Sequence, residues 1–155
     1  MKKIFWMLGI VIGIGVLCFA YYAISPLFIN LSADEALPLN VQVHVETGAP
    51  IEKMPEGSTV VGTVGHPASG TARVIVADGK SYVRYENFKT INGPDIYVYL
   101  AKDLDAKEFI SLGAVRATEG NINYEIPSSV TTADYPYVLT WCKRFGVLFN
   151  SARLQ

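Results

Sequence analysis

Cys142 is the residue of this chain whose type and surroundings most clearly suggest chemistry. Trp141 directly precedes it and Arg144 follows two residues later. Alternation along a strand would place Cys142 and Arg144 on the same face. A cation beside a thiol favours the reactive thiolate. The sequence therefore makes Cys142 a redox candidate, with Trp141 and Arg144 as supporting residues.

The opposite face of the same stretch carries Tyr137, Leu139 and Trp141. Such an aromatic face is expected to point into the core, because each ring buries a large area. A second interpretation of Cys142 is a buried cysteine that packs as a small hydrophobe, which is common for free cysteines. The only other cysteine, Cys18, lies in an apolar N-terminal run, so Cys142 is an odd cysteine in the remainder of the chain.

The other titratable residues form no recognisable catalytic or metal-binding pattern. His44 and His66 are the two histidines, whereas a zinc site needs three or four ligands. Paired carboxylates can divide acid and base work, but Asp103, Asp105 and Glu108 are interleaved with lysines, which favours a solvated surface. We therefore predict no enzyme activity, no metal and no cofactor.

The composition indicates one folded domain. Of the 155 residues, 50% are hydrophobic and only 17% are charged, against about 25% in an average soluble protein. Disorder is therefore excluded for most of the chain. With 13 basic and 14 acidic residues, the chain has no basic excess to neutralise a phosphate backbone, so nucleic acid is not an expected partner.

The N-terminus has the pattern of a membrane anchor. Lys2 and Lys3 are followed by an uncharged apolar run over residues 4–24. A bilayer span needs about 20 apolar residues, and positive residues before it stay in the cytoplasm. Residues 1–24 are therefore predicted as a cytoplasmic tip and membrane anchor, with membrane contact through residues 4–24 and a single pass. The rest of the chain would lie outside the cytoplasm.

A cleaved signal peptide is the alternative to a retained anchor. Its apolar region should span about 7–15 residues and end in a small-x-small pattern, which the stretch ending at Ala20 fits loosely. Tyr21, Tyr22 and Ile24 prolong the apolar run, which favours retention, whereas cleavage near Ala20 would give a secreted protein. The exported part keeps all 14 acidic residues but loses the two N-terminal lysines, and this balance gives no attraction to anionic lipid.

Residues 25–57 contain four prolines and are predicted as a stalk, with a short edge strand at Asn40–Val45. From residue 58 onward, short β runs alternate with turn signals. The runs are Thr59–Val64, Thr71–Ala77, Ser81–Phe88, Ile96–Ala101, Phe109–Ala117, Asn121–Ile126, Tyr137–Cys142 and Val147–Ala152.

This pattern predicts an all-β domain over residues 58–155. About eight short strands favour an antiparallel sandwich or barrel. Asp78-Gly79 is typical of a tight hairpin, whose central residues need positive φ. Asp103–Glu108 indicates the one helical turn. The many aromatic residues make the core sufficient without cross-links.

Several ordered motifs within this region resemble a known family. They are Gly65-His66-Pro67-Ala68-Ser69-Gly70-Thr71-Ala72, Tyr85-Glu86-Asn87-Phe88, Asn92-Gly93-Pro94-Asp95-Ile96-Tyr97-Val98-Tyr99-Leu100, Gly120-Asn121-Ile122-Asn123-Tyr124-Glu125-Ile126-Pro127 and Tyr137 to Phe149. Together, over about residues 58–155, they resemble the DM-thirteen domain, the Skeletor-associated extracellular module.

The resemblance implies a redox role. In animals the domain occurs beside DOMON and haem-cytochrome modules, and an electron-transfer role is proposed for the family from that company and a characteristic cysteine. Cys142 matches that cysteine. This chain differs from the animal architecture in having an anchor and one domain, with no DOMON module and no haem-binding histidine pair. An electron carrier would therefore belong to a separate redox or cytochrome partner.

Two hypotheses of function follow. In the first, the chain is a membrane-anchored, extracytoplasmic redox or electron-transfer accessory that uses Cys142. In the second, it is an envelope binding or structural module in which Cys142 only packs. The two differ in whether a reagent can reach the thiol of the folded domain.

Overall fold

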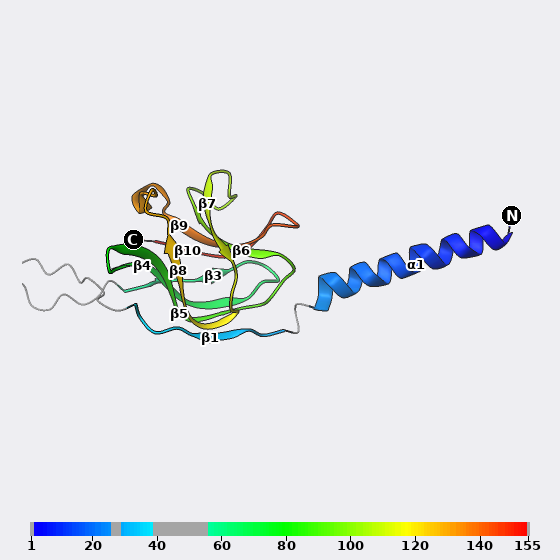
Figure 1. The fold of residues 1–155 in the computed structure, drawn as a ribbon, viewed down its shortest axis with the longest axis horizontal. Helices are drawn as coiled ribbons and strands as arrows, with labels where there is room; N and C mark the ends of the chain where they lie inside the picture. The colour runs from blue at the N-terminus through cyan, green and yellow to red at the C-terminus, as the bar shows by residue number, and fades with distance from the viewer. Residues whose placement is uncertain (1, 26–28, 39–55, 155) are drawn as a thin grey trace, which may run out of the picture.

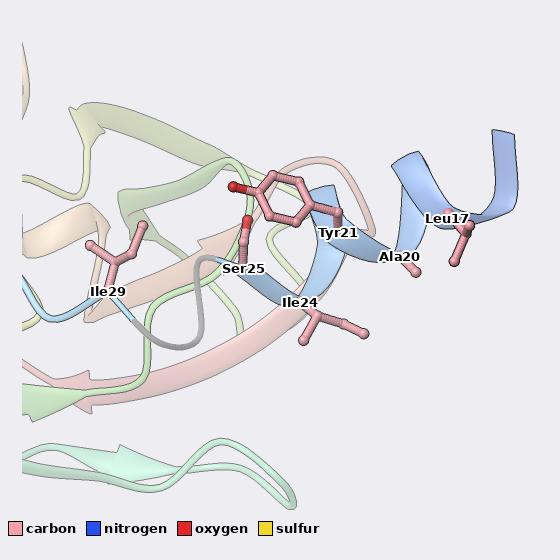
Figure 2. Close-up of a pocket in the computed structure, with 6 residues that line it drawn as sticks. All are labelled: Leu17, Ala20, Tyr21, Ile24, Ser25 and Ile29. Carbon is pink, nitrogen blue, oxygen red and sulfur yellow. The ribbon is translucent and has the colours of Figure 1, made fainter. Parts of the chain in front are cut away.

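The computed structural model describes residues 2–25, 29–38 and 56–154, and it consists of one helix and a two-layered β domain (Figure 1). Helix α1 (Lys2–Ile24) begins the chain. Its stretch Lys3–Ile24 is long and apolar enough to cross a membrane, and none of it is buried. Such an N-terminal helix is consistent with a signal anchor or a signal sequence. An apolar pocket at its C-terminal end is lined by Leu17, Ala20, Tyr21, Ile24, Ser25 and Ile29 (Figure 2).

The described strands form two five-stranded sheets. The first contains, in spatial order, β1 (Ser32–Asp34), β8 (Glu119–Ile126), β5 (Lys80–Thr90), β4 (Ala68–Ala77) and β2 (Ser58–Thr59). The second contains β3 (Val61–Gly62), β10 (Val147–Arg153), β9 (Tyr137–Cys142), β6 (Ile96–Ala101) and β7 (Phe109–Ala114). A short 3₁₀ helix, η2 (Thr132–Asp134), precedes β9. This sandwich-like arrangement confirms the predicted all-β class.

The main core joins apolar residues of both sheets. Val83 and Tyr85 of β5 and Ile122 of β8 belong to the same buried cluster as Leu100 of β6 and Val138 of β9. Each of these side chains is at most 1% exposed. Because residues of a strand alternate between two faces, the faces that carry these side chains are the inner faces of the sandwich.

The hairpin between β4 and β5 confirms the turn prediction. Asp78 and Gly79 both have positive φ, at 49° and 74°, as a two-residue hairpin of this type requires. The predicted run Thr59–Val64 instead divides into two short strands. β2 pairs with β4 of the first sheet and β3 pairs with β10 of the second. Val60, 2% exposed between them, is where the chain crosses between the layers.

The stretch Asp103–Glu108 forms an irregular turn rather than the predicted helical turn. The Asp103 carboxylate accepts hydrogen bonds from the backbone N–H groups of Asp105 and Lys107, at 2.9 and 3.2 Å. An aspartate that binds the backbone in this way competes with helix formation. The three carboxylates lie at a solvated turn, as the interleaved lysines indicated.

The two faces of β9 are the reverse of the sequence prediction. Val138 lies in the core between the sheets, whereas Leu139 is buried on the other face with Tyr99 and Ala101. Tyr137, Trp141 and Leu148 cover that second cluster and are half-buried. The aromatic face therefore lies outside the sandwich, where neighbouring side chains of the same sheet shield it.

The β domain extends into the segment predicted as a stalk. Ser32–Asp34 forms β1, which runs parallel to β8. A Cβ on Gly120 would collide with the Ala33 carbonyl, and Gly120 has a φ of +113°, so this glycine lets β1 approach closely. The edge strand predicted at Asn40–Val45 lies outside the described residues.

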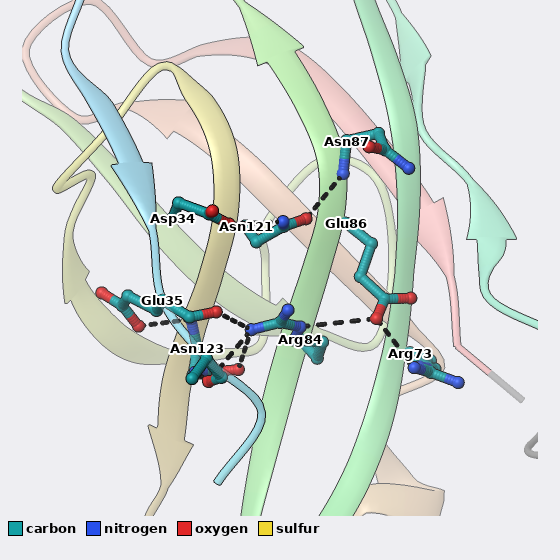
Figure 3. A network of polar contacts seen from close by, with 9 residues as sticks. Asp34, Glu35, Arg73, Arg84, Glu86, Asn87, Asn121 and Asn123 are labelled. Atoms are coloured by element: carbon teal, nitrogen blue, oxygen red, sulfur yellow. Dashed lines mark hydrogen bonds and ion pairs between the residues drawn. The ribbon is translucent and has the colours of Figure 1, made fainter.

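A polar network fastens β1 to the first sheet (Figure 3). The Arg84 guanidinium, 5% exposed, donates to the backbone carbonyl of Glu35 at 2.6 Å and to that of Ala36 at 3.3 Å. The Glu35 carboxylate accepts from the Asn123 N–H at 2.9 Å and pairs with Arg116 at 2.9 Å. Residues far apart in sequence thus hold the segment that follows the helix.

Candidate functional site

Cys142 is the last residue of β9, which is the central strand of the second sheet. Ile96 of β6 pairs with it on one side and Val147 of β10 on the other. Cys142 is 1% exposed. The strands on both sides and the apolar side chains of Ile96 and Phe149 together keep solvent from the thiol.

The thiol has a specific polar partner. The Cys142 Sγ donates a hydrogen bond to the backbone carbonyl of Pro94, with an S···O distance of 3.1 Å. Pro94 belongs to the turn over residues 92–95, which connects β5 with β6. A backbone bond from the Lys143 N–H to the Asp95 carbonyl, 3.0 Å long, fixes this turn beside the end of β9.

The first two residues of the turn over residues 92–95 also have fixed neighbours. The Asn92 amide donates to the Ile29 carbonyl at 3.1 Å and its side-chain oxygen accepts from the Gly93 N–H at 2.9 Å. A Cβ on Gly93 would stand 2.7 Å from the Phe149 ring, so glycine is required for this close approach. The turn therefore covers Cys142 through contacts that lie outside the two sheets.

The remaining neighbours of the thiol are apolar. Cys142, Ile96 and Phe149 form one buried cluster, against which Ile91 and Val115 pack. The Phe149 ring stacks on His66 with 4.1 Å between ring centroids, and His66 is half-buried. Aromatic stacking thus links the thiol's cluster to a partly exposed histidine.

Arg144 does not share the face of Cys142, which corrects the sequence prediction. The strand ends at Cys142, and Arg144 lies in the turn over residues 143–146, where alternation no longer applies. Its guanidinium stands 5.3 Å from the ring centre of Tyr22 on helix α1. Trp141 lies on the outer face of the sheet. The structure therefore does not bring the three candidate residues together around the thiol.

The inner face of β9 also carries a buried hydroxyl. Thr140 is fully buried, and neither its hydroxyl nor that of Tyr85 has a hydrogen-bond partner among the described residues. Burial, reinforced by Tyr124, raises the pKa of Tyr85 strongly, and the proximity of the Thr140 hydroxyl offsets only a little of that rise. Burial is likewise the main cause of the raised pKa of Tyr99 on the outer face.

The described part of the chain contains no group of three His, Cys, Asp or Glu side chains placed to hold a metal ion. His66 forms a 3.1 Å hydrogen bond through Nδ1 with the Thr63 hydroxyl. His44, which the sequence considered with it, lies outside the described residues. The candidate site therefore consists of the Cys142 thiol and the turn over residues 92–95 that covers it.

Sequence reasoning found Cys142 but missed Pro94, Phe149 and His66 as its surroundings. Residues 92–95 carry a strong turn signal, yet only the order of strands in the sheet places that turn beside β9. The motif around His66 was visible in the resemblance, without any sign that its ring would stack on Phe149. Contacts of this kind depend on long-range pairing and leave no local pattern.

Comparison with known proteins identifies a family for most of the β domain. The family model described as Electron transfer DM13 matches residues 61–154, more than half of the chain. No curated protein and no solved structure matches significantly. The match includes β4 to β10, and with them Cys142, the turn at Pro94 and the His66–Phe149 stack. The chain therefore belongs to the DM13 family of electron-transfer domains.

Proposed function

We propose that this chain is a membrane-anchored electron-transfer accessory that exchanges electrons with a separate redox protein outside the cytoplasm. The family supports the redox role. Helix α1, apolar and unburied, supports retention in a membrane. Lys2 and Lys3 before it support a cytoplasmic N-terminus. The partner in this proposal is a separate redox or cytochrome protein, because the part of the chain that the structure describes contains a single histidine, His66.

Cys142 is the redox group in this proposal, and it works from a closed resting state. Thiol–disulfide exchange needs a thiolate that can attack or be attacked at sulfur. With the Pro94 carbonyl at 3.1 Å and 1% exposure, no second sulfur can approach while the domain is closed. Exchange therefore requires movement of the turn over residues 92–95.

The observation that carries this proposal is that a turn, rather than a sheet, supplies the polar cover of the thiol. Cys142 lies at the end of its strand, and Pro94 belongs to a connection between strands. Loops open at lower free energy than core strands. Movement of this turn would expose Sγ without separating the two sheets.

A second candidate function has its own support. The apolar cluster of Cys142, Ile96 and Phe149 is the environment of a cysteine that only packs. In that case the chain is an anchored binding or structural module. The two functions differ in whether the folded domain ever presents the thiol.

The test is exchange with glutathione disulfide. The full chain in detergent, with Cys18→Ser, is incubated at neutral pH and analysed by mass spectrometry. In exchange, the Cys142 thiolate attacks the disulfide, one S–S bond forms to glutathione, and one glutathione thiolate leaves. A redox accessory gives a mixed disulfide at Cys142 without unfolding, reversed by reductant, and Cys18→Ser/Cys142→Ser gives none. Modification only in denaturant supports the packing function.

Topology is tested independently of the thiol. Protease added outside intact cells or spheroplasts should digest the β domain and leave α1 in the membrane. Protection of the β domain until lysis would contradict an extracytoplasmic location. Release of the whole domain into the medium would support cleavage near Ala20 and contradict the retained anchor.

A further inference from the structure

Four connections of the β domain lie at the end that faces helix α1, here called the helix-side end. They are residues 63–67, 91–95, 115–118 and 143–146. Strand pairing brings them together, because Ile96 and Val147 both pair with Cys142. The Thr63 N–H donates to the Phe149 carbonyl at 3.0 Å, which places the first connection at the same end. Figure 1 shows this end turned toward α1.

The chain that leaves the helix is fastened to this end. The Asn92 amide donates to the Ile29 carbonyl at 3.1 Å, and the Thr118 N–H donates to the Leu31 carbonyl at 2.7 Å. Arg144 contacts Tyr22 within the helix itself, at 5.3 Å. These contacts fix the helix-side end next to the point where a membrane-spanning α1 would leave the bilayer.

Tyr21 and Tyr22 near the end of α1 set the depth of that end. Tyrosines at the ends of spanning helices sit at the level of the lipid headgroups. Because the Arg144 guanidinium stands over the Tyr22 ring, a membrane-spanning α1 would place Arg144 at headgroup level too. The pocket at the helix end adds an apolar surface at the same level (Figure 2).

The tips of the helix-side connections expose apolar side chains. Val64 is fully exposed and Phe145 is 48% exposed, and Val147 at the start of β10 is 37% exposed. Exposed aromatic and aliphatic side chains beside cations are the composition of surfaces that lie in a membrane interface. Lys143 and Arg144 directly precede Phe145.

Charge is segregated between the two ends of the sandwich. In the four helix-side connections, Lys143 and Arg144 are basic and Asp95 is acidic, whereas Arg116 is paired with Glu35 at 2.9 Å. The connections at the other end, 78–79, 102–108 and 127–136, carry five acidic residues against two lysines: Asp78, Asp103, Asp105, Glu108, Asp134, Lys102 and Lys107. The helix-side end thus has a small basic excess, whereas the opposite end is acidic.

We propose that the helix-side end docks on the phospholipid surface of the leaflet from which α1 emerges. Phe145 and Val64 enter the boundary between headgroups and acyl chains, and Lys143 and Arg144 contact lipid phosphates. The proposal rests on the retained anchor of the proposed function. It adds a second membrane contact, which holds the domain upright with its acidic end toward the solvent.

The experiment uses the full chain with Cys18→Ser, reconstituted in vesicles of phosphatidylcholine and phosphatidylglycerol. A polarity-sensitive NBD label is attached at Val64→Cys on the helix-side end or at Asp78→Cys on the opposite end. The parent with Cys18→Ser alone measures background labelling at Cys142. Acyl-chain-brominated phosphatidylcholine then quenches labels that touch lipid. We expect a blue-shifted, quenched label at position 64 and an unshifted, unquenched label at position 78.

A matched pair of variants tests the contacting residues. Phe145→Ser/Arg144→Gln should reduce the quenching at position 64, whereas Leu104→Ser, which removes an exposed leucine (44%) from the opposite end, should leave it unchanged. High salt should reduce the part of the quenching at position 64 that depends on Lys143 and Arg144, because salt screens their attraction to lipid phosphates.

The outcomes separate the docking surface from the anchor. If the chain resists carbonate extraction and both labels are equally unquenched, docking is wrong and the anchor stands. If position 64 is shielded from water but not quenched by brominated lipid, another protein or a second copy covers this end, which also overturns lipid docking. Extraction by carbonate contradicts the anchor and the docking together.

Discussion

Cys142 donates its thiol hydrogen to the carbonyl of Pro94, 3.1 Å away, across 48 residues of sequence. The bond joins the end of a central strand to a turn that connects two other strands. The turn thereby covers the one cysteine of the β domain. Whether that turn opens in the folded protein decides between a redox thiol and a packed one.

Gly93 lets the turn over residues 92–95 pack closely against Phe149. An added Cβ would stand 2.7 Å from the Phe149 ring, and overpacking of this kind destabilises by about 1–3 kcal/mol. We therefore expect Gly93→Ala to lower the free energy of unfolding by that amount and to accelerate alkylation of Cys142 by iodoacetamide. The rate is measured by mass spectrometry in the Cys18→Ser background.

Gly79→Ala is the control for this effect. Gly79 has a φ of +74° with open space around it, so alanine there strains the backbone by about 1–2 kcal/mol far from the thiol. An equal acceleration in both variants would mean that general destabilisation, and not the cover, governs access to Cys142.

Tyr85 makes the stability of the domain sensitive to alkaline pH. Burial raises its pKa in the folded state, so the unfolded chain loses this proton first. The stabilising contribution is complete below the unfolded pKa of about 10 and is lost above it, by up to about 1.4 kcal/mol per pH unit. Tyr85→Phe should flatten the fall in urea-measured stability above pH 10.

The same substitution tests the unpaired hydroxyl. Removal of a buried hydroxyl without a partner should leave stability at neutral pH unchanged or raise it by about 1 kcal/mol. Tyr82→Phe, at a less buried tyrosine of the same strand, is the control. A large loss of stability in Tyr85→Phe at neutral pH would show that the hydroxyl has a stabilising partner.

β1 should contribute to the stability of the domain although it lies in a proline-rich segment. A fragment of residues 56–155 lacks the Glu35 and Ala36 carbonyls that Arg84 binds, and hydrogen bonds to a charged group contribute about 1.5–3 kcal/mol each. We expect it to be less stable than a fragment of residues 29–155 by about 3 kcal/mol, measured by urea denaturation.

Glu35→Gln in the longer fragment is the control for the ion pair alone. It removes the pairing with Arg116, which is half exposed, and an exposed pair contributes about 1 kcal/mol or less. Equal stability of the two fragments would mean that β1 rests on the sheet without stabilising it.

The sequence located the strands well where alternation and turn signals agreed. β6 and β9 have the predicted bounds, Ile96–Ala101 and Tyr137–Cys142, because turn residues delimit each run. β1 was missed because a three-residue strand is too short for any periodic signal, and its pairing partner, β8, lies far along the chain.

The faces of β9 could not be assigned from its sequence. Alternation separates Tyr137, Leu139 and Trp141 from Val138 and Cys142 but does not say which set is inside. Both sets are shielded, because Tyr99 and Leu148 of the neighbouring strands cover the aromatic set. Aromatic size alone was therefore a misleading guide to the inner face, and the position of Arg144 was wrong because the strand ends at Cys142.

The urea dependence of Cys142 alkylation, measured in the full chain with Cys18→Ser, tests most directly whether the turn over residues 92–95 opens in the folded protein. The slope with urea reports the surface exposed in the opening that precedes reaction. We predict that, well below the unfolding transition, Cys142 reacts much more slowly than a free thiol and with a shallow slope, because only the turn over residues 92–95 moves. A slope equal to that of global unfolding would contradict the redox role of Cys142, because reagents would then reach the thiol only in the unfolded chain.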